Sequence, residues 1–333
     1  MIDRHITLAH GNGGRMMREL IDTIFAPALR NVWLDTGADA VGLPSPEGEE
    51  LVVTTDGFTV QPLEFPGGDI GSLAVHGTVN DLAVAGAVPL YLTLNVFLEE
   101  GLETDLLQRL AVSIGRAARN CGVSVVAGDT KVVGRGECDG VYLATTGIGF
   151  RSRDLKLGFS QIRPGDRLIV SGPIGEHGTA VMLARESFGL RGDLQSDAAS
   201  VLPITRALAA IPGLRFMRDP TRGGLATVAH EIARATRHGI RLDEAAIPVS
   251  EPVQSVCELL GFDPLYLACE GRVVAVVASS TAGEALNAMR AHSSQAAVIG
   301  EVMTGDPDVV LLTAFGGERV LDELEDDPLP RIC

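Results

Sequence analysis

The sequence predicts an α/β fold in two domains. Short apolar runs typical of strands alternate with helical spacing in both halves of the chain, and a charged stretch followed by Pro164-Gly165-Asp166 separates the halves. The chain has 333 residues, 46% of them hydrophobic, which suffices for two buried cores. We place the junction near 152–163 and expect domains at 1–155 and 156–320, followed by a flexible tail at 321–333.

The first half contains four strand-like runs and three helical patterns. Residues 82–98 carry no charge, but Pro89 interrupts them and the run is shorter than a membrane span. We therefore interpret this run as a helix end followed by a strand. The expected strands are 51–55, 90–97, 123–127 and 141–149, and the expected helices are 14–29, 69–87 and 103–120.

The second half repeats the alternation. Glycine and proline turns, such as Pro164-Gly165 and Gly223-Gly224, stand before several of its elements. The expected strands are 167–171, 265–268, 272–278, 296–300 and 308–312. The expected helices are 176–188, 197–211, 223–236, 251–260 and 281–292.

Charge and cysteine usage limit the function class. Asp and Glu number 43 against 27 Lys and Arg, for a net charge of -16, so nucleic acid and anionic membrane are not expected partners. The amino-terminal residues lack the basic and apolar regions of a secretory signal. The five cysteines form no CxxC pair, which predicts a reduced, cytoplasmic chain without a zinc site.

The final residue, Cys333, is the most distinctive cysteine. It follows two prolines in Pro328–Cys333, and the acidic stretch 318–327 before them is kept solvated by mutual repulsion. These features predict a tethered thiol that swings. The alternative is a frayed terminus whose cysteine has no role. Cys121, Cys138, Cys257 and Cys269 are interpreted as small core or turn residues.

Lysine is rare, which makes its two positions informative. Lys156 lies in the charged stretch 151–156 and is expected at the surface. Lys131 lies in the segment Ala127–Lys131, which directly follows the apolar run Val123, Val125 and Val126. Because arginine does not lose its proton in proteins, a titratable amine must come from lysine. Lys131 is therefore the candidate for chemistry.

Five aspartates follow predicted strands or glycine turns. Oxygen ligands of this kind suit magnesium, which commonly binds a few carboxylates together with phosphate oxygens. Each aspartate alone has another interpretation, as a helix cap or turn former. The five residues are Asp56, Asp69, Asp81, Asp129 and Asp219.

The helix predicted from residue 69 carries a polar row. Asp69, His76 and Asn80 fall within roughly 40° of one another at the helical period. Because the rest of this helix is rich in Ala, Leu and Val, the row is predicted to line a site. The alternative for His76 is a core histidine with satisfied hydrogen bonds.

Glycine-rich turns could bind phosphate through backbone N–H groups at helix starts. They occur at His10–Gly14, Gly67-Gly68, Gly172–Gly178 and Gly223-Gly224. No GxxxxGK[ST] motif is present, because neither lysine follows a glycine. A nucleotide site would therefore use another scaffold than a P-loop.

Longer blocks carry a resemblance. They are TTDGF from Thr54, the segment Phe65–Pro89, AGDTKVV from Ala127, TTGIG from Thr145, SGPIGEHG from Ser171, DPTRGGL from Asp219, and the terminal PRIC. Together they resemble the HypE family, the carbamoyl dehydratases of [NiFe]-hydrogenase maturation, over essentially the whole chain. The aspartate pattern is similar to the wider superfamily of aminoimidazole ribonucleotide synthetase and selenophosphate synthetase. Glu176 departs from the family, which more often has Asp before His-Gly.

The resemblance implies a function. In the family, a HypF-type carbamoyltransferase loads a carbamoyl group onto the terminal cysteine, here Cys333, and ATP drives its dehydration from thiocarboxamide to thiocyanate. The cyano group then passes to iron on a HypC–HypD type complex. By motif, the five aspartates would hold Mg²⁺ and ATP phosphates, with Gly128 and Thr130 also at the nucleotide. His76 and Asn80 would orient phosphate or carbamoyl.

The resemblance also implies a fold. It is the two-domain aminoimidazole ribonucleotide synthetase-like fold, with an amino-terminal ATP-binding domain and a carboxyl-terminal two-layer α/β domain. The four-stranded sheet of the first domain is implied to pair with that of a second copy, giving a barrel-like homodimer.

The chemistry requires two bases near the thiol. An amide oxygen leaves poorly until it is phosphorylated, and two N–H protons must then be lost to give the nitrile. Lys131 and Glu270 are the candidates, and the family resemblance supports both. Alternatively, Glu270 is a strand-end carboxylate paired with Arg272.

Two other function classes stay open. One is a related ATP-dependent synthetase or kinase of the same fold that acts on a free small molecule, for which the tail is dispensable. The other is a non-enzymatic assembly protein whose acidic tail docks a partner, for which Cys333→Ser is neutral. The terminal PRIC favours the dehydratase.

Overall fold

The computed structural model describes residues 4–11, 15–36, 40–185, 193–325, 329 and 331–333. The chain divides into two compact units. The first comprises Met1–Leu82 and Ala87–Ser152 together with Cys333, and the second comprises Ala83–Gly86 and Arg153–Ile332. None of the described helices is long and apolar enough to cross a lipid bilayer.

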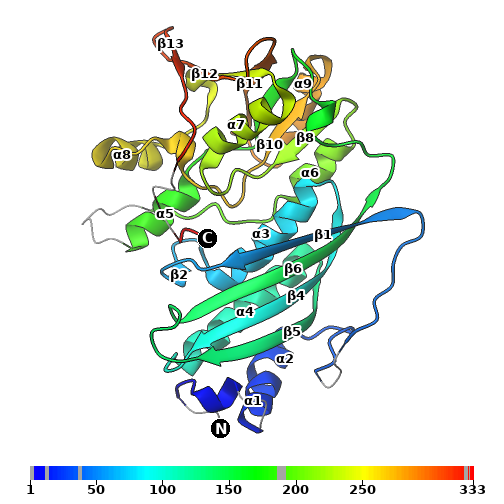
Figure 1. Ribbon diagram of the computed structural model, residues 1–333, viewed down its shortest axis with the longest axis vertical. Helices are drawn as coiled ribbons and strands as arrows, with labels where there is room; N and C mark the ends of the chain where they lie inside the picture. The colour runs from blue at the N-terminus through cyan, green and yellow to red at the C-terminus, as the bar shows by residue number, and fades with distance from the viewer. Residues whose placement is uncertain (1–3, 12–14, 37–39, 186–192, 326–328, 330) are drawn as a thin grey trace. The chain divides into compact units, whose positions relative to one another are not determined.

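A four-stranded sheet with two helices on one face forms the first unit (Figure 1). Its strand order is β1-β6-β4-β5, and β4 runs antiparallel to β6 but parallel to β5. The strands are β1 (Glu49–Phe58), β4 (Val88–Glu99), β5 (Ser124–Val133) and β6 (Val141–Ser152), and the helices are α3 (Ile70–Val84) and α4 (Thr104–Cys121). The four predicted strands and the helices predicted at 69–87 and 103–120 are thus confirmed, and all four strands are longer than predicted.

The covering helices follow from their apolar spacing. Helix α4 buries Leu107, Leu110 and Ile114, which recur at helical intervals on one side. The helix ends at Gly122, whose φ of 71° lies in the left-handed region.

The opposite face of the sheet is exposed. Alternation along β1 buries Phe58 but leaves Leu51 and Val53 58% and 56% exposed. In the part of the chain that the structure describes, β1 and β5 are the two edges of an open sheet rather than neighbours in a closed barrel.

Shorter elements complete the first unit. The helix predicted at 14–29 occurs in three pieces, α1 (Arg15–Leu20), a π-helical turn (Ile21–Phe25) and α2 (Ala26–Ala28). A 3₁₀ turn at Leu8–Gly11 precedes them, and a small ribbon joins β2 (Glu64–Phe65) to β3 (Gly68–Asp69). Gly14 lies outside the described residues, as do Asn12 and Gly13 of the predicted glycine turn.

A mixed seven-stranded sheet organises the second unit, in the order β13-β12-β9-β11-β7-β10-β8. Its strands are β7 (Arg167–Val170), β8 (Leu214–Arg218), β9 (Gly239–Asp243), β10 (Val274–Val277), β11 (Ala297–Met303), β12 (Val309–Leu312) and β13 (Glu318–Val320). Its helices are α5 (Glu176–Arg185), α6 (Leu202–Ala209), α7 (Gly224–Thr236), α8 (Glu251–Leu260) and α9 (Ala282–Arg290). The core packs α7 against the sheet through residues such as Leu225, Ile232 and Val276.

Four predictions require correction. The strand predicted at 265–268 is wrong, because Asp263 accepts a hydrogen bond from Leu265 N (3.0 Å) and starts a 3₁₀ turn at Pro264–Tyr266. The helix predicted from 197 begins at Leu202 instead, since Asp197 binds other segments. Asp56 and Asp129 lie inside β1 and β5 rather than after them. The unpredicted strands are β2, β3, β8, β9 and β13.

Candidate active site

Asp56 and Asp81 lie on the helix-covered side of the four-stranded sheet. Thr54 Oγ1 donates a hydrogen bond to Asp81 Oδ2 (2.7 Å). Asp56 shares the face of Thr54, and a Cβ atom placed on Gly77 would lie 3.7 Å from Asp56 Oδ2. Asp81 is one helical turn beyond Gly77, so both carboxylates lie along the same part of α3.

Asp69 stands at the start of α3. Its Oδ1 accepts a hydrogen bond from Ser72 N (2.9 Å), and its Oδ2 accepts one from Ser113 Oγ of α4 (2.6 Å). The helix-cap interpretation is therefore confirmed for this residue. Asp69 also lines an open hollow of about 590 Å³ together with Arg109 and Arg116, so capping leaves it accessible to a ligand.

His76 and Asn80 extend the polar row on α3. Asn80 is fully buried, and burial lowers the pKa of His76 to about 4, although the charge of Asp69 opposes the shift. His76 is therefore neutral near pH 7. Within the described ranges, its buried Nδ1 atom has no hydrogen-bond partner. An unsatisfied buried nitrogen beside Asp69 suits a bound polar group.

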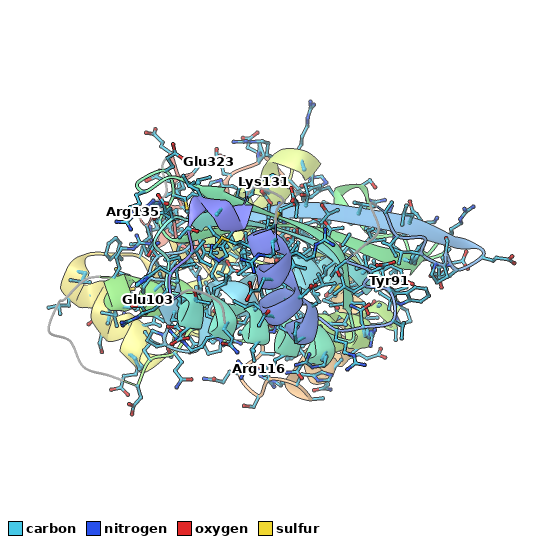
Figure 2. The ribbon with its side chains drawn as sticks, turned by 90° about the horizontal axis from the view of Figure 1, so that it is seen from below. Tyr91, Glu103, Arg116, Lys131, Arg135 and Glu323 are labelled. Carbon is cyan, nitrogen blue, oxygen red and sulfur yellow. The ribbon has the colours of Figure 1, made fainter. Side chains whose placement is uncertain are left out.

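Asp129 and Lys131 lie on the exposed face of the same sheet. Asp129 is opposite Asn95 of β4, and Lys131 is opposite Phe97. Lys131 Nζ lies 2.8 Å from Asp129 Oδ2, and both side chains are more than half exposed. The hydrogen bond from Lys131 lowers the pKa of Asp129. Figure 2 shows Lys131 on the sheet side of the drawing and Arg116 of α4 on the other side.

A small cavity adjoins the edge strand β5. Gly128, Asp129 and Thr130 line it, together with Asp35 and with residues of the amino-terminal helices, and its volume is about 170 Å³. Such a volume suits part of a nucleotide rather than all of it. Gly128 also has a packing role, because a Cβ there would overlap the carbonyl oxygen of Leu94.

The four predicted metal-ligand aspartates of the first unit do not gather in one cluster. The described residues contain no group of three or more His, Cys, Asp and Glu side chains arranged to hold a metal ion. Asp56, Asp69 and Asp81 lie along α3, Asp129 lies on the other face of the sheet, and Asp219 follows β8 in the second unit.

Glu270 is buried in a turn of the second unit, with 2% of its surface exposed. Its backbone N–H donates to Asp197 Oδ1 (3.1 Å), and Gly271 N donates to Asp197 Oδ2 (3.2 Å). Arg272, the alternative partner predicted for Glu270, pairs with Glu176 and with Asp197 (3.5 Å).

The carboxyl-terminal residues have defined positions in both units. In the first unit, Thr59 N donates to Cys333 O (3.0 Å), and the cysteine is partly exposed. In the second unit, His177 Nε2 lies 2.7 Å from Ile332 O. The predicted stiffening residues Pro328 and Pro330 lie outside the described residues, as do Asp326 and Asp327.

Sequence reasoning missed four residues around the chain end and Glu270. They are His177, Arg185, Ser196 and Asp197. Only His177 had been noticed in the sequence, as part of the glycine-rich turn Gly172–Gly178. We had interpreted that turn as a phosphate-binding turn. Asp197 falls within the stretch predicted as a helix and Ser196 directly precedes it. No pattern in the sequence indicated that either residue would hydrogen-bond to other segments.

The chain matches known families along most of its length. Residues 37–150 match the model of the AIR synthase related protein amino-terminal domain, and residues 163–312 match that of the carboxyl-terminal domain. The chain is 48% identical to carbamoyl dehydratase HypE of Azotobacter vinelandii, over 98% of this chain and 97% of that protein. The chain belongs to the HypE family. HypE of Escherichia coli is 43% identical over 99% of both chains.

Solved HypE structures share this fold. A crystal structure of HypE in complex with ATP superposes with a TM-score of 0.94 at 43% identity, covering 98% of this chain and 99% of that one. HypE in a HypE–HypF complex matches with a TM-score of 0.81 at 41% identity, over 93% of this chain and 100% of that one. A thiamine-monophosphate kinase from Stenotrophomonas maltophilia, 23% identical with a TM-score of 0.66, shares the fold alone.

Proposed function

We propose that this chain is a carbamoyl dehydratase that uses ATP to convert a thiocarboxamide on Cys333 into a thiocyanate. The product supplies the cyanide ligand for the iron of [NiFe]-hydrogenase. Full-length similarity to HypE, including a HypE bound to ATP, supports this function. The carrying observation is the position of Cys333, which is held through its main chain by Thr59 and is partly exposed.

The reaction balances as a dehydration driven by phosphoryl transfer. The carbamoyl oxygen on Cys333 accepts the γ-phosphoryl group of ATP, and the amide nitrogen loses one proton. Loss of the second N–H proton then expels phosphate and leaves S–C≡N. The products are the thiocyanate, ADP, phosphate and a proton.

Lys131 and Glu270 are proposed as the two bases. Glu270 is almost fully buried, in a turn of the second unit. Lys131 is held by its ion pair with Asp129 on the exposed face of the sheet. Because that face is open in one chain, Lys131 requires another surface to complete its surroundings.

That surface is proposed to be a second copy of the chain. The exposed face presents Leu51, Val53 and Phe97, which are large apolar side chains in contact with solvent. Pairing this face with its equivalent in a homodimer would bury them, in the barrel-like manner expected of the family. Asp129 and Lys131 would then project toward the partner copy.

Magnesium and ATP phosphates are proposed to bind along α3. The residues there fit, because Asp56, Asp69 and Asp81 provide oxygen donors and Mg²⁺ needs only one or two carboxylates beside phosphate and water. Bound magnesium would neutralise phosphate charge. His76 and Asn80 would orient the polar groups of the substrate. Asp129, Gly128 and Thr130 are proposed to contact nucleotide at the β5 cavity, and Asp219 to contribute from the second unit.

Two partners are proposed from the reaction. A HypF-type carbamoyltransferase must load Cys333, and one related HypE is known in a HypE–HypF complex. A HypC–HypD type iron complex would accept the cyano group. None of the five cysteines is disulfide-bonded, which suits the cytoplasmic location that we propose.

Mass spectrometry of the carboxyl-terminal peptide tests the function. The protein is incubated with a carbamoyltransferase, carbamoyl phosphate and either ATP or a non-hydrolysable analogue. We expect a carbamoyl adduct on Cys333 in both reactions and loss of one water only with ATP. An unmodified Cys333, with turnover of a free small substrate instead, would favour the related synthetase or kinase.

A further inference from the structure

Helix α5 binds Arg331 and Ile332, which are called the chain end below. His177 Nε2 lies 2.7 Å from Ile332 O, and Arg185 Nη2 donates to Arg331 O (2.7 Å). The Ile332 side chain is only 2% exposed. Two hydrogen bonds and one buried side chain therefore fix the residues directly before Cys333.

Arg331 adopts a conformation that needs such support. Its φ of 60° lies in the left-handed region, which residues other than glycine rarely adopt. A residue in that region persists where its surroundings hold it, and such residues concentrate at functional sites. The bond from Arg185 to the Arg331 carbonyl is one element of that support.

Burial and the Ile332 carbonyl set the protonation of His177. The histidine is fully buried, and burial lowers its pKa, so it is neutral near pH 7. Since the Ile332 carbonyl only accepts, Nε2 carries the proton and Nδ1 accepts from the Ser196 hydroxyl (2.8 Å). Ser196 Oγ in turn accepts from Ala198 N (3.0 Å), which orients the hydroxyl.

Asp197 connects the same segment to Glu270. Its two carboxylate oxygens accept from the backbone N–H groups of Glu270 and Gly271. A Cβ on Gly271 would overlap the Asp197 carbonyl oxygen, so these two segments pack in direct contact. Residues 196 and 197 thus bind the histidine that holds the chain end and the turn that carries the proposed base.

We propose that His177 and Asp197 are positioning residues for the dehydration. They fix Arg331, Ile332 and the Glu270 turn to one segment of the second unit, and thereby restrain the residues that carry Cys333. The proposal rests on the proposed function of Cys333 and Glu270. Positioning of this kind acts on the chemical step rather than on ATP binding.

The test compares two substitutions at His177. His177→Gln keeps a donor near the Nε2 position, whereas His177→Phe keeps the volume and leaves the Ile332 carbonyl without that donor. A carbamoyltransferase first loads each variant with a carbamoyl group from carbamoyl phosphate. ATP is then added, and mass spectrometry of the carboxyl-terminal peptide follows the rate of dehydration in a single turnover. ATP affinity is measured separately.

We expect His177→Phe to slow dehydration roughly 10- to 100-fold at unchanged ATP affinity, and His177→Gln to stay within a few-fold of the unsubstituted protein. Alkylation of Cys333 by iodoacetamide should accelerate in the Phe variant alone. Dehydration at the unsubstituted rate by folded His177→Phe would overturn the proposal.

Arg185→Met provides a second variant if His177→Phe does not fold. Arg290→Met is its matched control, because Arg290 also donates from the last turn of a helix to a backbone carbonyl, that of Ala296. Only Arg185→Met should accelerate Cys333 alkylation, and equal rates in both variants would contradict the proposal. The unsubstituted protein could show no dehydration while the alkylation rates still differ as expected. The proposed function would then be wrong, but the restraint of Arg331 and Ile332 by α5 would be supported.

Discussion

Lys131 Nζ lies 2.8 Å from Asp129 Oδ2 on the exposed face of the four-stranded sheet, across that sheet from the carboxylates beside α3. This arrangement separates two groups of residues that the sequence placed in one site. The proposed homodimer would therefore have a chemical role, because the second copy would surround Lys131.

Lys131→Arg should trap the carbamoyl form of Cys333. Arginine preserves the ion pair with Asp129 but does not act as a base at neutral pH. We expect dehydration to fall by about 100-fold or more while carbamoyl loading continues, as measured by the mass of the carboxyl-terminal peptide. Normal dehydration would remove Lys131 from the mechanism. Lys156→Arg, at the other lysine, serves as the control.

Asp81→Asn should weaken ATP binding in the presence of Mg²⁺. The amide keeps an acceptor for Thr54 Oγ1 but loses the charge that favours a cation. We expect a roughly tenfold rise in Kd by calorimetry, with a small change in Tm. Asp308→Asn removes an exposed carboxylate of the second unit and should leave Kd unchanged. An unaltered Kd in Asp81→Asn would exclude Asp81 from the nucleotide site.

Val53→Asp should convert a dimer into a monomer. The new charge lies on the exposed apolar face, where pairing would require its burial without a partner. Light scattering should show the mass of one chain instead of two. Val112→Asp, an exposed valine of α4 on the other side of the sheet, should leave the mass unchanged. A monomeric unsubstituted protein would contradict the homodimer directly.

His177 should make stability fall in mild acid. Its pKa is lowered in the folded state by burial, which the nearby Asp197 charge only partly opposes, whereas the unfolded value is about 6.5. As the pH falls below about 6.5, the unfolded chain binds a proton that the folded chain resists, so the free energy of unfolding decreases.

Urea denaturation at about pH 7.5 and about pH 5.5 measures this effect. The unsubstituted protein should lose up to about 1.4 kcal/mol more than His177→Gln between these values, because other histidines contribute equally to both proteins. Equal losses in the two proteins would show that His177 takes up its proton as easily when folded as when unfolded.

The sequence located most elements but not the faces that their side chains occupy. Apolar runs predicted β1, β4 and β6, and helical spacing predicted α3 and α4. Strand β5 was cut short because Gly128-Asp129 resembles a turn, yet Gly128 continues the strand at the point where it approaches Leu94.

Strand register explains why Asp129 lies apart from the aspartates beside α3, although the sequence predicted one site for them. Thr54 and Asp56 share the face that α3 covers, whereas register with Asn95 turns Asp129 to the exposed face. Glu270 was selected from its motif as a candidate base, and that role stays a prediction. Its contact with Asp197 is made between residues 73 positions apart, and no local pattern indicates such a contact.

The chemical fate of Cys333 tests the central claim most directly. Carbamoyl phosphate labelled with ¹³C, a carbamoyltransferase and ATP are supplied, and the label is followed by ¹³C NMR on the intact protein. The account predicts a thiocarboxamide signal on Cys333 that is replaced by a thiocyanate signal as ATP is consumed, and no signal of either kind in Cys333→Ser. A label that never reaches Cys333, or a thiocarboxamide that persists while ATP is hydrolysed, would contradict it.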